Sequence, residues 1–208
     1  MTVTWSEKEG RRRSFLERTT KETQITLALD LDGGRKALDV PGGFFGHMLD
    51  ALATHGGLGL EVSAKGDTHI DLHHTVEDVG IVLGDAMLEA LGDRKGVVRF
   101  ASAYAPLDEA LARAVVDLSG RGFFVNSMPE ELEQVWVTQD FPLSLIVDFF
   151  QAFADRGRFT LHLDILRARN GHHAAEAAFK AVAVALRQAL RVREGGAEVP
   201  STKGTLTV

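Results

Sequence analysis

The sequence predicts an α+β fold in which one strand-rich α/β unit occurs twice, giving two sheets whose helices pack pseudo-symmetrically. The first observation is that the pattern His-His-x-x-Glu occurs at 73–77 and again at 172–176, and each copy opens an apolar stretch with helical periodicity. The second is that the flanking residues match weakly but in the same order, as in an internal duplication. We therefore expect residues 14–100 and 101–194 to be two units of one compact domain.

Each unit is expected to contain the same elements in the order βββαβα. The first clear strands alternate apolar and polar residues and end at turns that contain glycine. In chain order the paired elements are strands 23–31 and 110–118, helices 47–55 and 145–156, strands 60–64 and 159–166, and the long helices that begin at the two motifs. The repeat aligns Glu22 with Glu109, Gly33 with Gly120, and His47 with Asp148.

The composition is that of an ordinary globular protein. The 208 residues are 45% hydrophobic and 25% charged, and the net charge of -6 gives no reason to expect nucleic-acid binding. The chain has no cysteine, which excludes disulfides and thiolate ligands and favours a cytoplasmic location. No apolar run is long enough to span a bilayer, so no membrane partner is expected. Residues 1–13, with three consecutive arginines, are expected to form a flexible, solvated tail without the apolar core of a signal peptide.

The His-His-x-x-Glu motifs point to metal binding. On a helix the first histidine and the glutamate share one face, whereas the second histidine points about 100° further round and could serve a different centre. Paired histidines could also cap helices or satisfy hydrogen bonds in the core, but the duplication favours metal. Without thiolates, imidazole and carboxylate together favour manganese, iron or cobalt over zinc. The eight candidate ligands, enough for two centres, are His47, His73, His74, Glu77, His162, His172, His173 and Glu176.

Basic and hydroxyl residues suggest a second kind of site, for an anion. Each base alone would be an ordinary surface charge, but a convergence of arginine and lysine suits a phosphate monoester. The candidates are Arg99, Arg121, Lys180, and Ser201 and Lys203 of the tail 195–208. Of the two remaining histidines, His69 lies beside an alternating strand and is expected to be exposed or structural. His55 lies at a helix C-terminus, where a helix-dipole interaction explains it as well as a substrate contact does.

Several segments resemble the imidazoleglycerol-phosphate dehydratase family. They are GFFGHMLDALATHG, GDTHIDLHHTVEDVGI, LGDRKGVVRF, PLDEALARAVVDLSGR, HHAAEAAFKAVAVALRQAL and VPSTKG. The resemblance extends from about Arg18 to Leu206, nearly the whole chain. Without a phosphatase-type domain, the chain resembles the monofunctional form of the family.

This resemblance implies an enzyme of histidine biosynthesis that dehydrates imidazole glycerol phosphate to imidazole acetol phosphate. It implies two Mn²⁺ ions per active site, held by the eight candidate ligands, and a substrate phosphate bound by the five basic and hydroxyl residues. It further implies trimers that assemble into a twenty-four-subunit shell with active sites between subunits. The only partners expected are the phosphorylated substrate and other copies of the chain.

The resemblance also implies roles in the chemistry. Glu22 matches the family's acid–base glutamate, and Asp108 and Glu109 are lesser candidates, with Glu109 explained structurally by its alignment with Glu22. A metal on an imidazole nitrogen would act as a Lewis acid, favour imidazolate and permit a diazafulvene-like intermediate. His55 is retained as a catalytic candidate through its possible substrate contact.

One departure from the family pattern stands beside His47. The family usually has aspartate before this histidine, and this chain has Gly46 after an altered lead-in, Val40-Pro41-Gly42-Gly43. We expect Gly46 to weaken or alter the His47 end of the site without abolishing function, since losing such a neighbour can reduce affinity or activity by about 10- to 100-fold. Two alternatives remain: a dinuclear metallohydrolase for a phosphorylated small molecule, and a metal-dependent assembly without activity.

Overall fold

The computed structural model describes residues 11–195, 198–202, 204 and 206, and it confirms the duplicated α+β fold. The first half contains β1 (Arg13–Thr19), β2 (Thr23–Asp30), β3 (Lys36–Asp39), α1 (Gly43–Gly56), β4 (Gly59–Gly66) and α2 (His73–Leu91). The second half contains β5 (Phe100–Leu107), β6 (Ala110–Asp117), β7 (Phe123–Ser127), α3 (Glu130–Glu133), β8 (Trp136–Thr138), β9 (Phe141–Pro142), α4 (Leu145–Gly157), β10 (Thr160–Arg167) and α5 (Gly171–Leu190).

The two large sheets have the same topology. Their strand orders are β1-β2-β4-β3 and β5-β6-β10-β7, and in each sheet only the last pair is parallel. The turns after β2 and β6 also correspond, because Gly33 and Gly120 both have φ +86°. Glycine adopts this left-handed conformation without strain, which explains why both units place it there.

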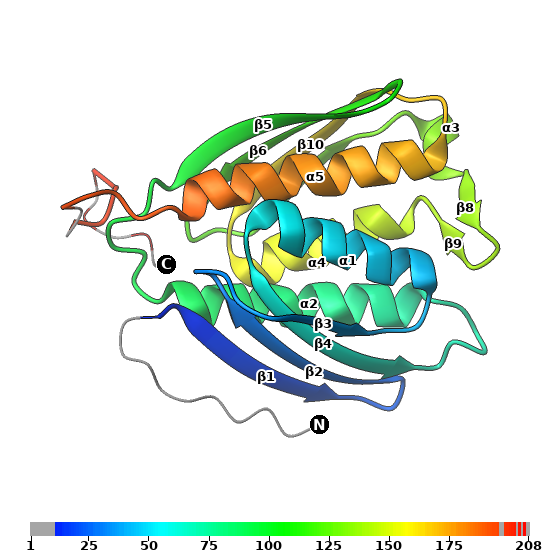
Figure 1. The fold of residues 1–208 in the computed structure, drawn as a ribbon, viewed down its shortest axis with the longest axis horizontal. Helices are drawn as coiled ribbons and strands as arrows, with labels where there is room; N and C mark the ends of the chain where they lie inside the picture. Colours follow the sequence, from blue (N-terminus) through cyan, green and yellow to red (C-terminus); the bar gives the residue numbers. More distant parts are fainter. Residues whose placement is uncertain (1–10, 196–197, 203, 205, 207–208) are drawn as a thin grey trace.

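The helices lie between the two sheets (Figure 1). Helix α2 covers β1 and β2 while α1 lies beside β3, and in the other half α5 covers β5 and β6 while α4 lies beside β7. The halves then join through their helices, with α1 against α5 and α2 against α4. Consequently the His-His-x-x-Glu motif of each half faces a helix of the other half.

The α2–α4 contact depends on two glycines. A Cβ on Gly80 would lie 2.7 Å from the carbonyl oxygen of Phe149, and one on Gly84 would lie 2.8 Å from that of Phe153. Real Cβ atoms do not approach a carbonyl oxygen so closely, so only glycine permits this helix separation. No helix within the described residues is long and apolar enough to cross a membrane.

The structure differs from the prediction at the start of α1, in the second half and at residues 11–13. Helix α1 begins at Gly43 rather than at residue 47, because Phe44 and Phe45 bury its first turn in the core. The second half carries α3, β8 and β9, which have no counterpart in the first half and were not predicted. The prediction of a solvated tail is wrong for residues 11–13, whereas residues 1–10 lie outside the described part.

Ion pairs with the first sheet explain the error at residues 11–13. Arg13 begins β1 and its Nε lies 2.5 Å from Oδ2 of Asp30, and Arg11 pairs with the same carboxylate at 3.3 Å. Arg12 pairs with Asp32 at 2.7 Å and donates to the carbonyl oxygen of Leu190, also at 2.7 Å. The three cations therefore attach the start of β1 to the turn after β2 and to the end of α5.

Candidate metal centre

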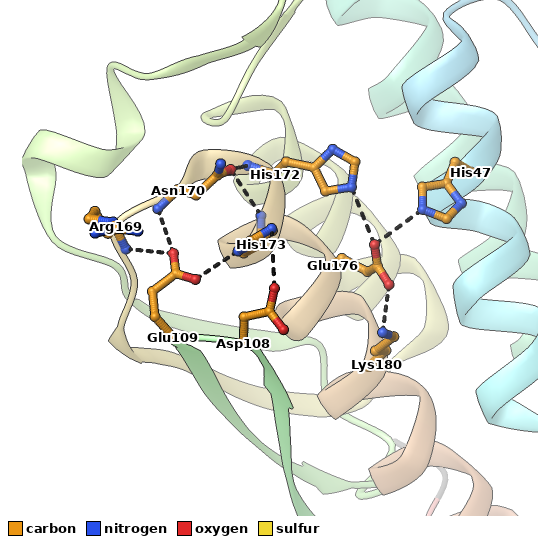
Figure 2. Close-up of polar contacts among 9 residues, drawn as sticks. All are labelled: His47, Asp108, Glu109, Arg169, Asn170, His172, His173, Glu176 and Lys180. Atoms are coloured by element: carbon orange, nitrogen blue, oxygen red, sulfur yellow. Dashed lines mark hydrogen bonds and ion pairs between the residues drawn. The ribbon is translucent and has the colours of Figure 1, made fainter.

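One compact group of side chains that could hold a metal ion joins the two halves of the chain. Figure 2 shows His47 reaching from α1 toward His172 and Glu176 near the start of α5. Nε2 of His47 and Nε2 of His172 lie 3.2 and 3.3 Å from Oε2 of Glu176, and the three ligand atoms lie within 4.8 Å of one another. Two imidazoles and a carboxylate at this spacing fit a divalent transition-metal ion.

The carboxylate of this group is ionised at neutral pH. Partial burial acts to raise the pKa of Glu176, but the Lys180 ammonium and the His47 ring outweigh it and lower that pKa to about 2. Nζ of Lys180 lies 2.5 Å from Oε1, while Oε2 faces the two histidines. Lys180, predicted to bind phosphate, therefore lies next to the candidate metal ligands, one helical turn further along α5.

A second, more open group lies at the α2–α4 contact. Nε2 of His73 lies 3.9 Å from Oε2 of Glu77, and Nδ1 lies 3.3 Å from Oδ2 of Asp148. Asp148 occupies in α4 the position that His47 occupies in α1, as the repeat alignment indicates. A cleft of about 700 Å³, lined in part by Trp136 and Ile70, opens beside His73 and Asp148. The two halves thus place different ligand chemistry at corresponding positions.

The second histidine of each motif contacts a different carboxylate. Nδ1 of His74 lies 3.0 Å from Oδ2 of Asp67, and Nδ1 of His173 lies 2.7 Å from Oε2 of Glu109. The hydrogen bond to Asp67 is the main cause that raises the pKa of His74. The corresponding bond from His173 is the main cause that lowers the pKa of Glu109 to about 2. Both second histidines therefore point away from the glutamate of their own motif, as their helical spacing predicted.

The helix that carries the second motif is capped by Asn170. Its Oδ1 accepts hydrogen bonds from the backbone N–H groups of His172, at 2.8 Å, and His173, at 3.4 Å. Asp71 serves the first motif similarly, because its Oδ1 accepts from the N–H of His73 at 2.8 Å. A side chain that satisfies these otherwise unpaired N–H groups fixes where each motif begins.

The acid–base candidates are in different environments. Glu22 lies exposed in the β1–β2 turn, and its charge contributes to raising the pKa of His74. Its counterpart Glu109 accepts from His173 and from the backbone N–H groups of Arg169 and Asn170. Asp108, in the β5–β6 turn, is exposed and lies 4.0 Å from Nε2 of His173. Among the candidate carboxylates, Glu109 is therefore held by hydrogen bonds, whereas Glu22 and Asp108 are exposed.

Two of the predicted site histidines lie apart from these groups within one chain. His162 lies on the outer face of β10, opposite Val115 of β6 and Val125 of β7, whereas its neighbours Leu161 and Leu163 point into the core. His55 lies in the last turn of α1, eight residues after His47 and therefore about 12 Å along the helix. The structure does not bring either side chain to the candidate metal ligands of its own chain.

The C-terminal segment is attached by two arginines. Arg99 pairs with Asp117 at 2.8 Å and donates from Nη1 to the carbonyl oxygen of Pro200 at 2.7 Å. Arg94 is almost fully buried and donates from Nη1 to the carbonyl oxygen of Leu206, also at 2.7 Å. Among the described residues, Nε and Nη2 of Arg94 have no hydrogen-bond partner. These bonds hold the segment that contains Ser201 against the start of the second half.

The candidate metal ligands His172 and Glu176 lie at the start of α5, whereas Arg99, a predicted phosphate ligand, contacts its other end. The backbone N–H of Arg99 donates to the carbonyl of Ala189, which is 17 residues beyond His172 and so about 25 Å along the helix. Arg121 lies in the β6–β7 turn, where its backbone N–H donates to Oγ of Ser119. Lys203 lies outside the described residues. One chain alone therefore does not place Arg99 beside the His47–His172–Glu176 group.

Sequence reasoning missed four residues that support the site. Asp148 could have been found, because the repeat alignment places it opposite His47. Asn170 also had a signal, since asparagine before a helical motif is a preferred capping residue. Asp67 and Arg94 had none, because their contacts join segments whose proximity only the fold creates.

Comparison with known proteins gives consistent matches over nearly the whole chain. Residues 41–186 match the family described as imidazoleglycerol-phosphate dehydratase. The protein of that name from Acidiphilium cryptum is 53% identical over 198 residues, which is 94% of this chain and 99% of the relative. The one from Halorhodospira halophila is 52% identical over 200 residues, 95% of this chain and all of the relative.

Two solved structures share the fold. The imidazoleglycerol-phosphate dehydratase of Staphylococcus aureus has a TM-score of 0.77 and 37% identity, covering 87% of this chain and 99% of that chain. The enzyme of Pyrococcus furiosus has a TM-score of 0.79 and 34% identity, covering 91% of this chain and 99% of that chain. Sequence and structure thus lead to the same group of proteins.

Proposed function

The chain belongs to the imidazoleglycerol-phosphate dehydratase family, and on that premise we propose how its own side chains perform the reaction. It is a hydro-lyase of histidine biosynthesis that acts on a small-molecule substrate. We propose that the reaction converts imidazole glycerol phosphate to imidazole acetol phosphate and water. Beside family membership, the observation that carries the proposal is the His47–His172–Glu176 group, a set of converging ligands contributed by both halves.

The proposed cofactor is a pair of Mn²⁺ ions in each active site. The ligands would come from the two motif groups together with the second histidines and His162. Nitrogen and carboxylate donors of this kind fit manganese, and among the described residues one triad already has a suitable spacing. When bound, the metal would supply Lewis-acid stabilisation of negative charge on the imidazole ring of the substrate.

Glu22 is the proposed acid–base residue. The reaction removes a proton bound to carbon, after departure of hydroxide leaves the substrate ring in a diazafulvene-type form. Proton transfer of this kind requires a side chain that can exchange a proton at working pH. Glu22 is exposed and near His74, whereas Glu109 is held as a carboxylate by a pKa of about 2. His55 and Asp108 are weaker candidates, because His55 lies far from the ligands of its own chain and Asp108 lies at the edge of the site.

The substrate phosphate is proposed to bind the basic and hydroxyl residues, Arg99, Arg121, Lys180, Ser201 and Lys203. Guanidinium groups suit this role because they donate paired hydrogen bonds to phosphate oxygens. Asp117 orients the guanidinium of Arg99. The hydrogen bond from Arg99 to the carbonyl oxygen of Pro200 holds the next residue, Ser201, close to Arg99. The positive charge of Lys180, which pairs with Glu176, would also attract the negatively charged phosphate.

A complete site is proposed to form between copies of the chain. The first support is the separation of about 25 Å between the start of α5, with its metal ligands, and the end bonded to Arg99. A second is that His162 faces outward from β10, so it can contribute only to a neighbour's centre. We propose trimers that assemble into a 24-mer, as in the family resemblance.

The outer faces of the two sheets support this assembly. On the outer face of the second sheet His162 lies between Val115 and Val125 and next to the Arg113–Asp164 ion pair. The most exposed apolar side chains of this face are Phe100, Tyr104, Val115, Phe123 and Leu166. The outer face of the first sheet carries mainly polar side chains, such as Glu17, Gln24 and Lys65. Large exposed apolar patches mark interaction sites. Because this patch lies beside His162, a proposed metal ligand, it fits a second copy of this chain.

Sedimentation analysis of two surface variants tests the assembly. Val115→Glu places a charge in the apolar face and is expected to give smaller oligomers that bind less manganese. The control, Thr26→Glu, changes the polar outer face of the first sheet and is expected to leave both quantities unchanged. An unchanged sedimentation coefficient for Val115→Glu would refute the role of this face.

Turnover measurements test the function. Chelator-stripped protein is expected to be inactive and to form imidazole acetol phosphate once manganese is added. The assay should also measure released inorganic phosphate, since release without dehydration would indicate a metallohydrolase instead. If protein that binds two metal ions forms neither imidazole acetol phosphate nor inorganic phosphate, it would be an inactive assembly.

A further inference from the structure

The two second histidines are held in the same way by residues that do not correspond in the repeat. Asp67 follows β4, and the residue that follows β10 in the other half is Ala168, which cannot accept a proton. Glu109 comes from the β5–β6 turn, and its counterpart Glu22 is not hydrogen-bonded through its side chain within the described residues. The carboxylate contact of His74 and His173 is therefore not a consequence of the duplicated backbone. Two residues at different positions in the repeat, Asp67 and Glu109, make the same contact.

The geometry determines which ring nitrogen is available. A carboxylate facing Nδ1 accepts the N–H of a neutral imidazole, so the lone pair is left on Nε2. His74 faces Asp67 through Nδ1 at 3.0 Å, and His173 faces Glu109 through Nδ1 at 2.7 Å. In each case Nε2 is the nitrogen directed away from the supporting carboxylate.

We propose that Asp67 and Glu109 are positioning residues that hold His74 and His173 with Nδ1 as the hydrogen-bond donor and Nε2 as the metal-binding atom. Such outer partners fix the tautomer and orientation of a ligating histidine, and their loss typically lowers metal affinity by about 10- to 100-fold. The inference rests on the proposed metal sites and adds residues outside the predicted ligand set. It also gives Glu109 a role distinct from acid–base catalysis.

Asp67 provides the cleaner test of the two. Within the described residues its carboxylate hydrogen-bonds only to His74, whereas Glu109 also supports the loop before α5 through the N–H groups of Arg169 and Asn170. Removing Glu109 therefore disturbs both the histidine and the helix start. Removing Asp67 disturbs only the histidine.

The experiment is a calorimetric titration of Mn²⁺ into chelator-stripped, full-length protein. Asp67→Ala is expected to weaken manganese binding by about 10- to 100-fold. Asp67→Asn should retain part of the affinity, because its amide oxygen can accept the same proton from Nδ1. The matched control, Asp85→Ala, removes a carboxylate that pairs with Arg156 at 2.8 Å and is expected to bind manganese like the unmodified protein.

The outcomes separate this inference from the proposed function. If the unmodified protein binds no manganese, the proposed metal centre fails. If it binds manganese and Asp67→Ala binds equally well, only the positioning role is overturned. Equal losses in Asp67→Ala and Asp67→Asn would attribute the effect to lost charge and would also overturn positioning. A larger loss in Asp67→Ala than in Asp67→Asn, with normal thermal unfolding of both variants, supports it.

Discussion

The two halves of the chain have the same backbone plan but use corresponding side chains differently. Glu22 and Glu109 occupy matching turns, yet Glu22 is exposed while Glu109 is fixed by His173 and two backbone N–H groups. His47 and Asp148 occupy matching helix positions, yet only His47 joins a compact ligand triad. The comparison teaches that the duplication kept the geometry that aligns the helices and left single side chains free to diverge.

The largest expected effect is the difference in kcat between substitutions of Glu22 and of Glu109. Glu22→Gln is expected to lower kcat by about 100- to 10,000-fold, because it removes the group that exchanges the proton, and excess manganese should not restore it. Glu109→Gln is expected to weaken manganese binding and to regain most of its kcat at saturating metal. Steady-state kinetics across a manganese series checks both. Normal kcat in Glu22→Gln would contradict the proposed asymmetry.

The next effect separates His47 from Asp148. His47→Ala removes a member of the triad and is expected to weaken manganese binding more than about 100-fold, beyond the usual range for an outer partner. Asp148→Ala removes only the 3.3 Å contact to the partly buried His73, so a loss of manganese affinity near the lower end of that range, about 10-fold, is expected. Titration of stripped protein measures both. Equal losses would show that the two halves bind metal alike.

A third prediction concerns the helix pairs. Gly84→Ala would place a Cβ 2.8 Å from the carbonyl oxygen of Phe153, so the α2–α4 pair must separate, and a loss of about 1–3 kcal/mol in the free energy of unfolding is expected. The control is Gly43→Ala at the start of α1, where a Cβ meets nothing within 4 Å. Denaturant unfolding of the metal-free protein measures both. If Gly84→Ala and Gly43→Ala have the same free energy of unfolding, α2 and α4 can move apart without loss of stability.

The smallest expected effect concerns Gly46, beside His47. A Cβ there would meet only Cγ2 of Val40, at 3.4 Å, so an aspartate fits on α1. Gly46→Asp is expected to strengthen manganese binding by up to about 10-fold, since an acidic neighbour can orient a ligating histidine. A negative charge in the first helical turn should also stabilise the helix by about 0.3–1 kcal/mol. Unchanged turnover and unchanged manganese affinity would refute the hypothesis.

The elements that were predicted well are those whose signal is local. Apolar residues alternate along β2 and β6 and recur with helical periodicity in α2 and α5. The structure buries the faces that carry these apolar residues. The inserted elements α3, β8 and β9 were missed because they are short and have no counterpart to align. Residues 11–13 were misjudged because their charge indicated solvent, whereas Asp30 and Asp32 neutralise them in the folded chain.

The sequence by itself determined the duplication, the helical spacing that separates the two histidines of each motif, and the chemical types of the candidate ligands. These features follow from residue order, because a helix places positions four apart on one face whatever it packs against. Only the tertiary structure decided that α1 meets α5, that Asp67 and Glu109 face the second histidines, and that the metal group and Arg99 lie at opposite ends of α5. Those contacts join residues distant in the chain, and their partners are selected by packing of the whole core rather than by any local pattern.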